Sequence, residues 1–141
     1  MTSTELPPLE RILAFMQAGL AEQIALKEEM GICPGCTFGN LAVELASVDE
    51  VVRARLESLF GDWAGLLRVA LDDAVAAGDL PQIDTDRAAR ALLAYVEGLS
   101  VMAKTADDPM SVVDLMPLAL QLIGAPGETV TPARATERTH R

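Results

Sequence analysis

The stretch TDRAARALLAYVEGLSVMAK, residues 85–104, decides the fold of this chain. Alanine, leucine, valine and methionine fill most of it, and Arg87, Arg90, Glu97 and Lys104 leave only a narrow polar strip. A helix that packs on one core needs an apolar stripe of about 100°. Because the apolar surface here is wider than that, a single core does not account for all of it.

The same helical period continues on both sides of this segment. Apolar residues recur at three- and four-residue steps, and no stretch alternates apolar and polar residues at period two. The aromatic content is only 4%. We therefore expect an all-α protein, a five-helix orthogonal bundle, with helices over residues 6–29, 37–46, about 48–77, 85–106 and 109–123.

Several residues mark where these helices begin and end. Ser47 has the spacing of a capping box for the third helix, and Gly78 stands where a left-handed residue would end it. Asp84 and Asp108 are expected to cap the fourth and fifth helices. Pro117 falls inside the fifth helix and predicts a kink there.

Length and composition indicate one domain. A chain of 141 residues suffices for a single core. Residues 1–124 carry the helical pattern, whereas residues 125–141 are rich in Thr, Arg and Pro and predict a disordered tail. The net charge is −10 and the cations are not clustered, so we expect no nucleic acid contact by this chain.

The N-terminus has neither a basic region nor an apolar core, and no apolar run approaches the ~20 residues that span a bilayer. We expect neither a signal peptide nor membrane contact. Only two cysteines are present, which favours a reducing compartment over a disulfide scaffold. The expected location is the cytoplasm.

Cys33 and Cys36 lie two residues apart, immediately before the second helix. A helix N-terminus favours a thiolate, so one interpretation is a thiol-based sensor of oxidants or electrophiles. The other is that both are small packing residues. A zinc site needs four ligands, and the chain adds only His140, so we expect no metal and no cofactor.

The last two helices have more apolar surface than a single core needs. Small residues at Ala94 and Gly98 allow close approach of another helix. We therefore expect a homodimer in which these helices of two copies form a four-helix bundle; the alternative is a monomer in which they are the central helices. The expected interface comprises Ala94, Gly98, Val113, Met116, Leu120 and Ile123.

The motif Gly35-Cys36-x-x-Gly39-Asn40-Leu41-Ala42-x-Glu44-Leu45, followed by Ala76-Ala77-Gly78-Asp79-Leu80, resembles the C-terminal regulatory domain of the tetracycline-repressor (TetR) family. Residues 85–104 and 108–124 look like the last two helices of that domain, so the resemblance covers residues 7–124. In such regulators an N-terminal helix-turn-helix domain binds the operator. We expect that domain to be absent from this chain, because about six residues precede the first helix.

The resemblance also implies an effector pocket among the first, third and fourth helices. The residues on the facing stripes suit a small, mostly apolar ligand. A lone tyrosine in an apolar helix must find a hydrogen-bond partner if it is buried, so Tyr95 is singled out. The candidate ligand-binding residues are Phe15, Met16, Leu20, Trp63, Leu67, Tyr95, Leu99 and Met102.

The leading functional hypothesis is an effector-binding and dimerisation domain of a TetR-like transcriptional regulator. The alternatives are a stand-alone protein that sequesters a ligand or partner, or a thiol-based sensor through Cys33 and Cys36. No enzyme is expected, because the single histidine lies in the tail and acidic residues such as Glu44, Glu97 and Asp114 are spread over separate helices.

Overall fold

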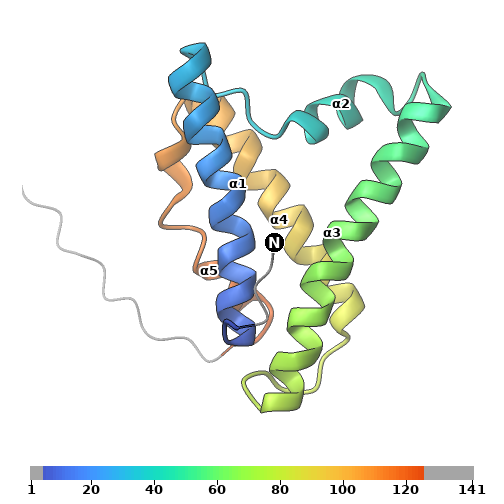
Figure 1. The fold of residues 1–141 in the computed structure, drawn as a ribbon, viewed down its shortest axis with the longest axis vertical. Coiled ribbons are helices and arrows are strands. Elements are labelled where there is room, and N and C mark those ends of the chain that lie inside the picture. Colours follow the sequence, from blue (N-terminus) through green and yellow to red (C-terminus); the bar gives the residue numbers. More distant parts are fainter. Residues whose placement is uncertain (1–4, 126–141) are drawn as a thin grey trace, which may run out of the picture.

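A computed structural model describes residues 5–125, and all of its regular structure is helical (Figure 1). The expected all-α fold is thus confirmed. The predicted tail lies outside the described residues from position 126 onward. The elements are α1 (Pro8–Met30), α2 (Thr37–Leu45), α3 (Glu50–Ala77), α4 (Thr85–Ala106), the 3₁₀ helix η1 (Pro109–Val112) and α5 (Leu118–Leu122).

The long helices α1, α3 and α4 form the body of the molecule. Helix α4 packs against α3 and against η1, and α1 packs against α3 and η1. Helix α2 connects the end of α1 to the start of α3 and contacts α3 (Figure 1). None of the residues of α2 is buried, so this short helix borders the body without entering its core.

The core forms where α1, α3, α4 and the C-terminal segment meet. Ile12 of α1 and Leu71 of α3 are its largest fully buried side chains. Three alanines at 0% exposure, Ala74, Ala103 and Ala119, come from three different elements. Their small side chains let the backbones approach closely, which is how a chain with few aromatic residues reaches close packing.

Aspartates cap the helix starts. The Asp49 carboxylate accepts hydrogen bonds from the amides of Val51 (2.9 Å) and Val52 (3.0 Å) at the start of α3. The expected Ser47 cap is therefore wrong: Ser47 lies in a turn, and a carboxylate directly before the helix reaches two free amides at once. Asp84 caps α4 as expected, and Gly78 ends α3 with a φ of 83°.

The continuous helix predicted over residues 109–123 is wrong. Asp108 caps as expected, but η1 ends at Val112, turns follow, and α5 begins only at Leu118. Pro117 has no amide to donate to the preceding turn, and its ring disfavours helical geometry in the residue before it. The Tyr95 hydroxyl donates to the Leu115 carbonyl at 2.8 Å, which satisfies a backbone acceptor inside this irregular stretch.

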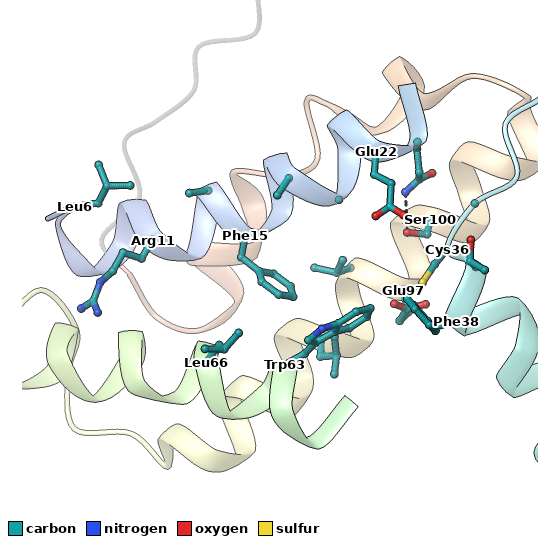
Figure 2. A pocket seen from close by; sticks show the side chains of 18 of the residues that line it. Leu6, Arg11, Phe15, Glu22, Cys36, Phe38, Trp63, Leu66, Glu97 and Ser100 are labelled. Atoms are coloured by element: carbon teal, nitrogen blue, oxygen red, sulfur yellow. Dashed lines mark hydrogen bonds between the residues drawn. The ribbon is translucent and has the colours of Figure 1, made fainter. Parts of the chain in front are cut away.

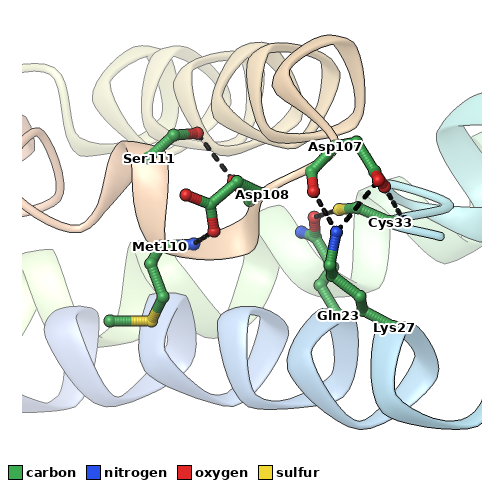
Figure 3. A network of polar contacts seen from close by, with 7 residues as sticks. All are labelled: Gln23, Lys27, Cys33, Asp107, Asp108, Met110 and Ser111. Carbon is green, nitrogen blue, oxygen red and sulfur yellow. Dashed lines mark hydrogen bonds and ion pairs between the residues drawn. The ribbon is translucent and has the colours of Figure 1, made fainter. Parts of the chain in front are cut away.

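A polar network attaches the loop between α1 and α2 to the end of α4 (Figure 3). The Cys33 amide donates to the Asp107 carboxylate at 2.6 Å, and Lys27 forms an ion pair with the same carboxylate at 3.1 Å. The Cys33 amide, followed by Lys27, lowers the pKa of Asp107. The buried Cys33 thiol donates to the side-chain oxygen Oε1 of Gln23 at 3.7 Å. Cys33 therefore helps to hold the loop between α1 and α2 against Gln23 of α1 and Asp107 at the end of α4.

Replacing Leu71 by alanine should lower the free energy of unfolding by about 2 to 5 kcal/mol, because the side chain is fully buried and would leave a cavity. Leu66→Ala, on the same helix at 46% exposure, should cost about 1 kcal/mol or less. Urea unfolding followed by circular dichroism measures both. Equal losses for the two variants would contradict the position of the core.

Candidate functional site

A cavity of about 980 Å³ lies between α1, α3, α4 and the start of α2 (Figure 2). Its two ends differ in chemistry. Apolar side chains form most of the wall, and polar side chains gather where α1, α4 and the N-terminus of α2 converge. The lining residues are Glu5, Leu6, Arg11, Ala14, Phe15, Ala18, Gly19, Glu22, Gln23, Gly35, Cys36, Thr37, Phe38, Trp63, Leu66, Leu93, Val96, Glu97 and Ser100.

An aromatic cluster forms one wall of the cavity. All three phenylalanines of the chain pack edge-on against the single tryptophan, Trp63. The ring centroids lie 6.2 Å from Trp63 for Phe15, 5.6 Å for Phe38 and 5.7 Å for Phe60. These separations and tilted planes are the favourable geometry for aromatic pairs. Phe15, Phe38 and Trp63, from three different helices, face the cavity.

Cys36 and Glu97 meet at the polar end. The Cys36 sulfur accepts the Gly39 amide at 3.3 Å and caps α2, while its thiol hydrogen-bonds to the Glu97 carboxylate. Burial, with a smaller contribution from the Glu97 charge, raises the pKa of Cys36 despite the opposing Gly39 amide. Because the thiolate is the reactive form, this environment makes Cys36 a poor nucleophile.

Glu97 is half-buried beside α2. Burial raises the pKa of its carboxyl, and the hydrogen bond from Cys36 opposes that shift. Gly39 leaves room for this approach, since a Cβ at that position would collide with the Glu97 carboxylate. One turn further along α4, the buried Ser100 hydroxyl accepts a 3.0 Å hydrogen bond from the Gln23 amide, which joins α1 to α4.

Arg11 lies at the other end of the cavity. Its side chain is 8% exposed and one guanidinium nitrogen forms an ion pair with Asp73 at 2.5 Å. Its Nε has no hydrogen-bond partner among the described residues. A buried arginine is costly unless its charge is paired. Asp73 supplies that pairing, so Arg11 is both a structural ion pair and a polar group on the cavity wall.

Of the candidate ligand-binding residues, Phe15 and Trp63 line the cavity. Met16, Leu67 and Leu99 are buried in the hydrophobic core instead, and Leu20 packs against that core. These four occupy helix faces that contact neighbouring helices and not the open space.

Tyr95 and Met102 also lie away from the cavity wall. The Tyr95 hydroxyl has found the expected partner in the Leu115 carbonyl, and burial raises the pKa of Tyr95, which keeps the hydroxyl a donor. Met102 is 55% exposed. Both are on α4, on sides that turn away from α1 and α3.

Sequence reasoning missed the polar lining of the cavity. Arg11, Phe15, Ala18 and Glu22 all line it, and they follow one another along α1 at steps of three and four residues. That spacing places them on a single helix face. The spacing is visible in the sequence, but the charged residues Arg11 and Glu22 made this face resemble a solvent-exposed surface.

The residues of the expected dimer interface differ in exposure, because some lie on the surface and others are buried within one copy. Ala94 and Gly98 are exposed on α4, and Val113 and Leu120 are partly buried. Met116 and Ile123 are buried within one copy, at 6% and 9% exposure. The interruption of the helix at Pro117 explains the difference, because residues 109–123 do not share one helical face.

A second, open groove of about 600 Å³ runs between α3 and α4. Small residues form much of it, including Gly61 and Gly65 of α3 and Ala94 of α4. No atom lies within 4 Å of where a Cβ would be at Gly61 or Gly65, so neither glycine is required by a close neighbour. Leu93 and Glu97 line both this groove and the cavity, and therefore form part of the wall between them.

Within residues 5–125, no group of three or more His, Cys, Asp or Glu side chains lies close enough to hold a metal ion. No helix in the same range has the length and apolarity needed to cross a membrane.

Long helices surround a cavity in this domain, and comparison with known proteins identifies the family. The chain belongs to the tetracyclin repressor-like C-terminal domain family, whose model matches residues 8–117. The resemblance drawn from the sequence is thereby confirmed. Such domains bind ligands and dimerise within transcriptional regulators, and they are regulatory and not catalytic. No curated protein and no solved structure matches the chain.

Glu97→Gln should change how stability depends on pH. Because burial raises the pKa of Glu97 above its ordinary value of 4.5, the folded state holds its proton more tightly than the unfolded chain does. In the wild type, the contribution of Glu97 to the free energy of unfolding is fully present below about pH 4.5. This contribution is lost as pH rises through the raised pKa. The glutamine variant lacks this loss, so its advantage over wild type should grow as pH rises.

Urea midpoints between pH 4 and pH 8 measure this difference. Glu44→Gln, which removes a carboxylate from an exposed position on α2, is the matched control and should follow the wild-type profile. Parallel profiles for Glu97→Gln and wild type would show that burial does not act on Glu97.

Proposed function

We propose that this chain is the effector-binding and dimerisation domain of a TetR-like transcriptional regulator, comprising residues up to 124, and that a small, mostly apolar molecule binds in the 980 Å³ cavity. The observation that carries the proposal is the aromatic wall. Phe15, Phe38 and Trp63 come from three helices and face an open space instead of a filled core. Ligand sites have this combination of apolar walls and a few placed polar groups.

The cavity is well placed for an effector to act on the arrangement of the helices. Its wall includes α1, α3, α4 and the start of α2, so a bound molecule would contact all three long helices at once. A ligand shifts an equilibrium only by its differential affinity for the two states. We propose that the effector favours one packing of α1 and α3 against α4, and that a DNA-binding partner domain senses that packing.

We further propose that a second copy covers the exposed face of α4. Ala91, Ala94, Gly98 and Val101 are all exposed and follow one another at steps of three and four residues, with Val101 at 61% exposure. Small residues on one face allow two helices to approach closely. A two-fold pairing of α4 would remove this apolar strip from water.

The thiol-sensor alternative receives no support from the site. Cys33 is buried away from solvent, and burial raises the pKa of Cys36, which disfavours the thiolate that sensing requires. Both cysteines are free, which is consistent with the reducing cytoplasm that we propose as the location of the protein.

Binding in the cavity predicts a signal from Trp63, because it is the only tryptophan and lines the wall. Titration with the neutral apolar dye N-phenyl-1-naphthylamine should give saturable energy transfer from Trp63. Phe15→Ala should weaken binding about tenfold, since it removes apolar contact area. Phe60→Ala is the matched control: it contacts Trp63 without lining the cavity, and should change affinity less than twofold. Equal effects of both variants would reject the cavity as the binding site.

Dimerisation through α4 predicts a solution mass of twice 15.0 kDa in sedimentation at micromolar concentration. Ala94→Glu should shift the protein toward the monomer, because it places an unpaired charge in the proposed interface. Ala76→Glu, an identical change on the exposed surface of α3, should leave the dimer intact. A wild-type protein that sediments as a monomer at 100 µM would refute this interface.

A further inference from the structure

Two carboxylates occupy the polar end of the cavity. Glu22 comes from α1 and Glu97 from α4, and both line the same space. Neither forms an ion pair with a lysine or arginine within the described part of the chain. Glu97 is half-buried and loses part of its hydration, which makes an unpaired negative charge unfavourable there, whereas Glu22 is exposed at the edge of the cavity.

The helix packing brings these two carboxylates to the same end. The Gln23 amide and the Ser100 hydroxyl are 3.0 Å apart, which fixes this part of α1 against α4. Glu22 directly precedes Gln23, and Glu97 lies one turn before Ser100 on the same face of α4. Figure 2 shows both acidic side chains near Cys36 and Ser100. A group of the right size at this end can contact both helices.

Among residues 5–125, no cation neutralises this end. Arg11 is the one cationic side chain among the described lining residues, and it lies at the opposite end with its charge paired to Asp73 (Figure 2). Lys104 donates its hydrogen bond to the Asn40 side chain and does not line the cavity. The polar end therefore keeps an excess of negative charge.

The aromatic wall adjoins the acidic end. Phe38 and Glu97 lie close together in Figure 2, with Trp63 beside them, and the Phe38 and Trp63 rings are 5.6 Å apart. Aromatic faces attract cations, tryptophan most strongly, and they also accept apolar groups. Carboxylates and aromatic rings thus make the same end of the cavity attractive to a positive charge attached to an apolar body.

We propose that the effector is an amphipathic cation: an amine or quaternary onium group, placed between Glu22 and Glu97, joined to an apolar or aromatic body that packs along Phe15 and Trp63. This inference rests on the proposed function, because it names the chemical class of the molecule that the cavity binds. The proposal adds to the expected apolar effector a positively charged group.

The test uses two ions of nearly equal size and opposite charge, tetraphenylphosphonium and tetraphenylborate. Calorimetry and Trp63 fluorescence at about 0.15 M salt, where the Debye length is about 8 Å, limit the influence of the overall charge of the chain. We expect the phosphonium ion to bind at least tenfold more tightly. Glu97→Gln and Glu22→Gln should each weaken phosphonium binding about tenfold and leave borate binding no weaker.

Glu44→Gln is the control, because it removes the same charge from α2 at an exposed position outside the cavity. It should leave the ratio of the two affinities unchanged. Equal binding of both ions, or an equal effect of the Glu44 and Glu97 variants, would overturn the cation preference while leaving a working cavity. If neither ion binds and the neutral naphthylamine dye does not bind either, the proposed effector cavity itself is refuted.

Discussion

The burial of one face of α4 is the constraint on which the rest of the structure depends. Leu92, Leu93, Leu99 and Ala103 are buried, and α3 and η1 pack against this helix. A helix with so broad an apolar surface cannot lie on the outside of a small domain without exposing it to water. The remaining elements are arranged around α4, and the strip that they leave open, including Gly98, is where we place the second copy.

The same packing creates the cavity. Helices α1 and α3 contact each other, and α1 also contacts η1, but their side chains do not fill the space in front of Val96, Glu97 and Ser100. Polar and aromatic groups beside an unfilled space lose van der Waals contacts that they would have in a filled core. The carboxyl of Glu97 is half-buried there, and the Arg11 Nε has no hydrogen-bond partner among residues 5–125. These features accord with the ligand site that we propose.

Glu97 connects the two open regions of the molecule. Its side chain lines the cavity and also the groove between α3 and α4, and it contacts Cys36 at the start of α2. Glu97 is thus a shared part of the wall of both spaces and of the contact with α2.

The helical class and most helix boundaries follow from the sequence alone, because period and capping are local properties of a chain. Phe15 and Trp63 were likewise predictable as pocket residues. Tertiary structure decided the rest. Met16, Leu67 and Leu99 share apolar periodicity with the cavity wall, yet face neighbouring helices, and Glu22 and Glu97 meet only because the Gln23–Ser100 contact sets the register of α1 against α4. Periodicity defines a helix face, but only the rotation of each helix in the packed domain determines what that face meets.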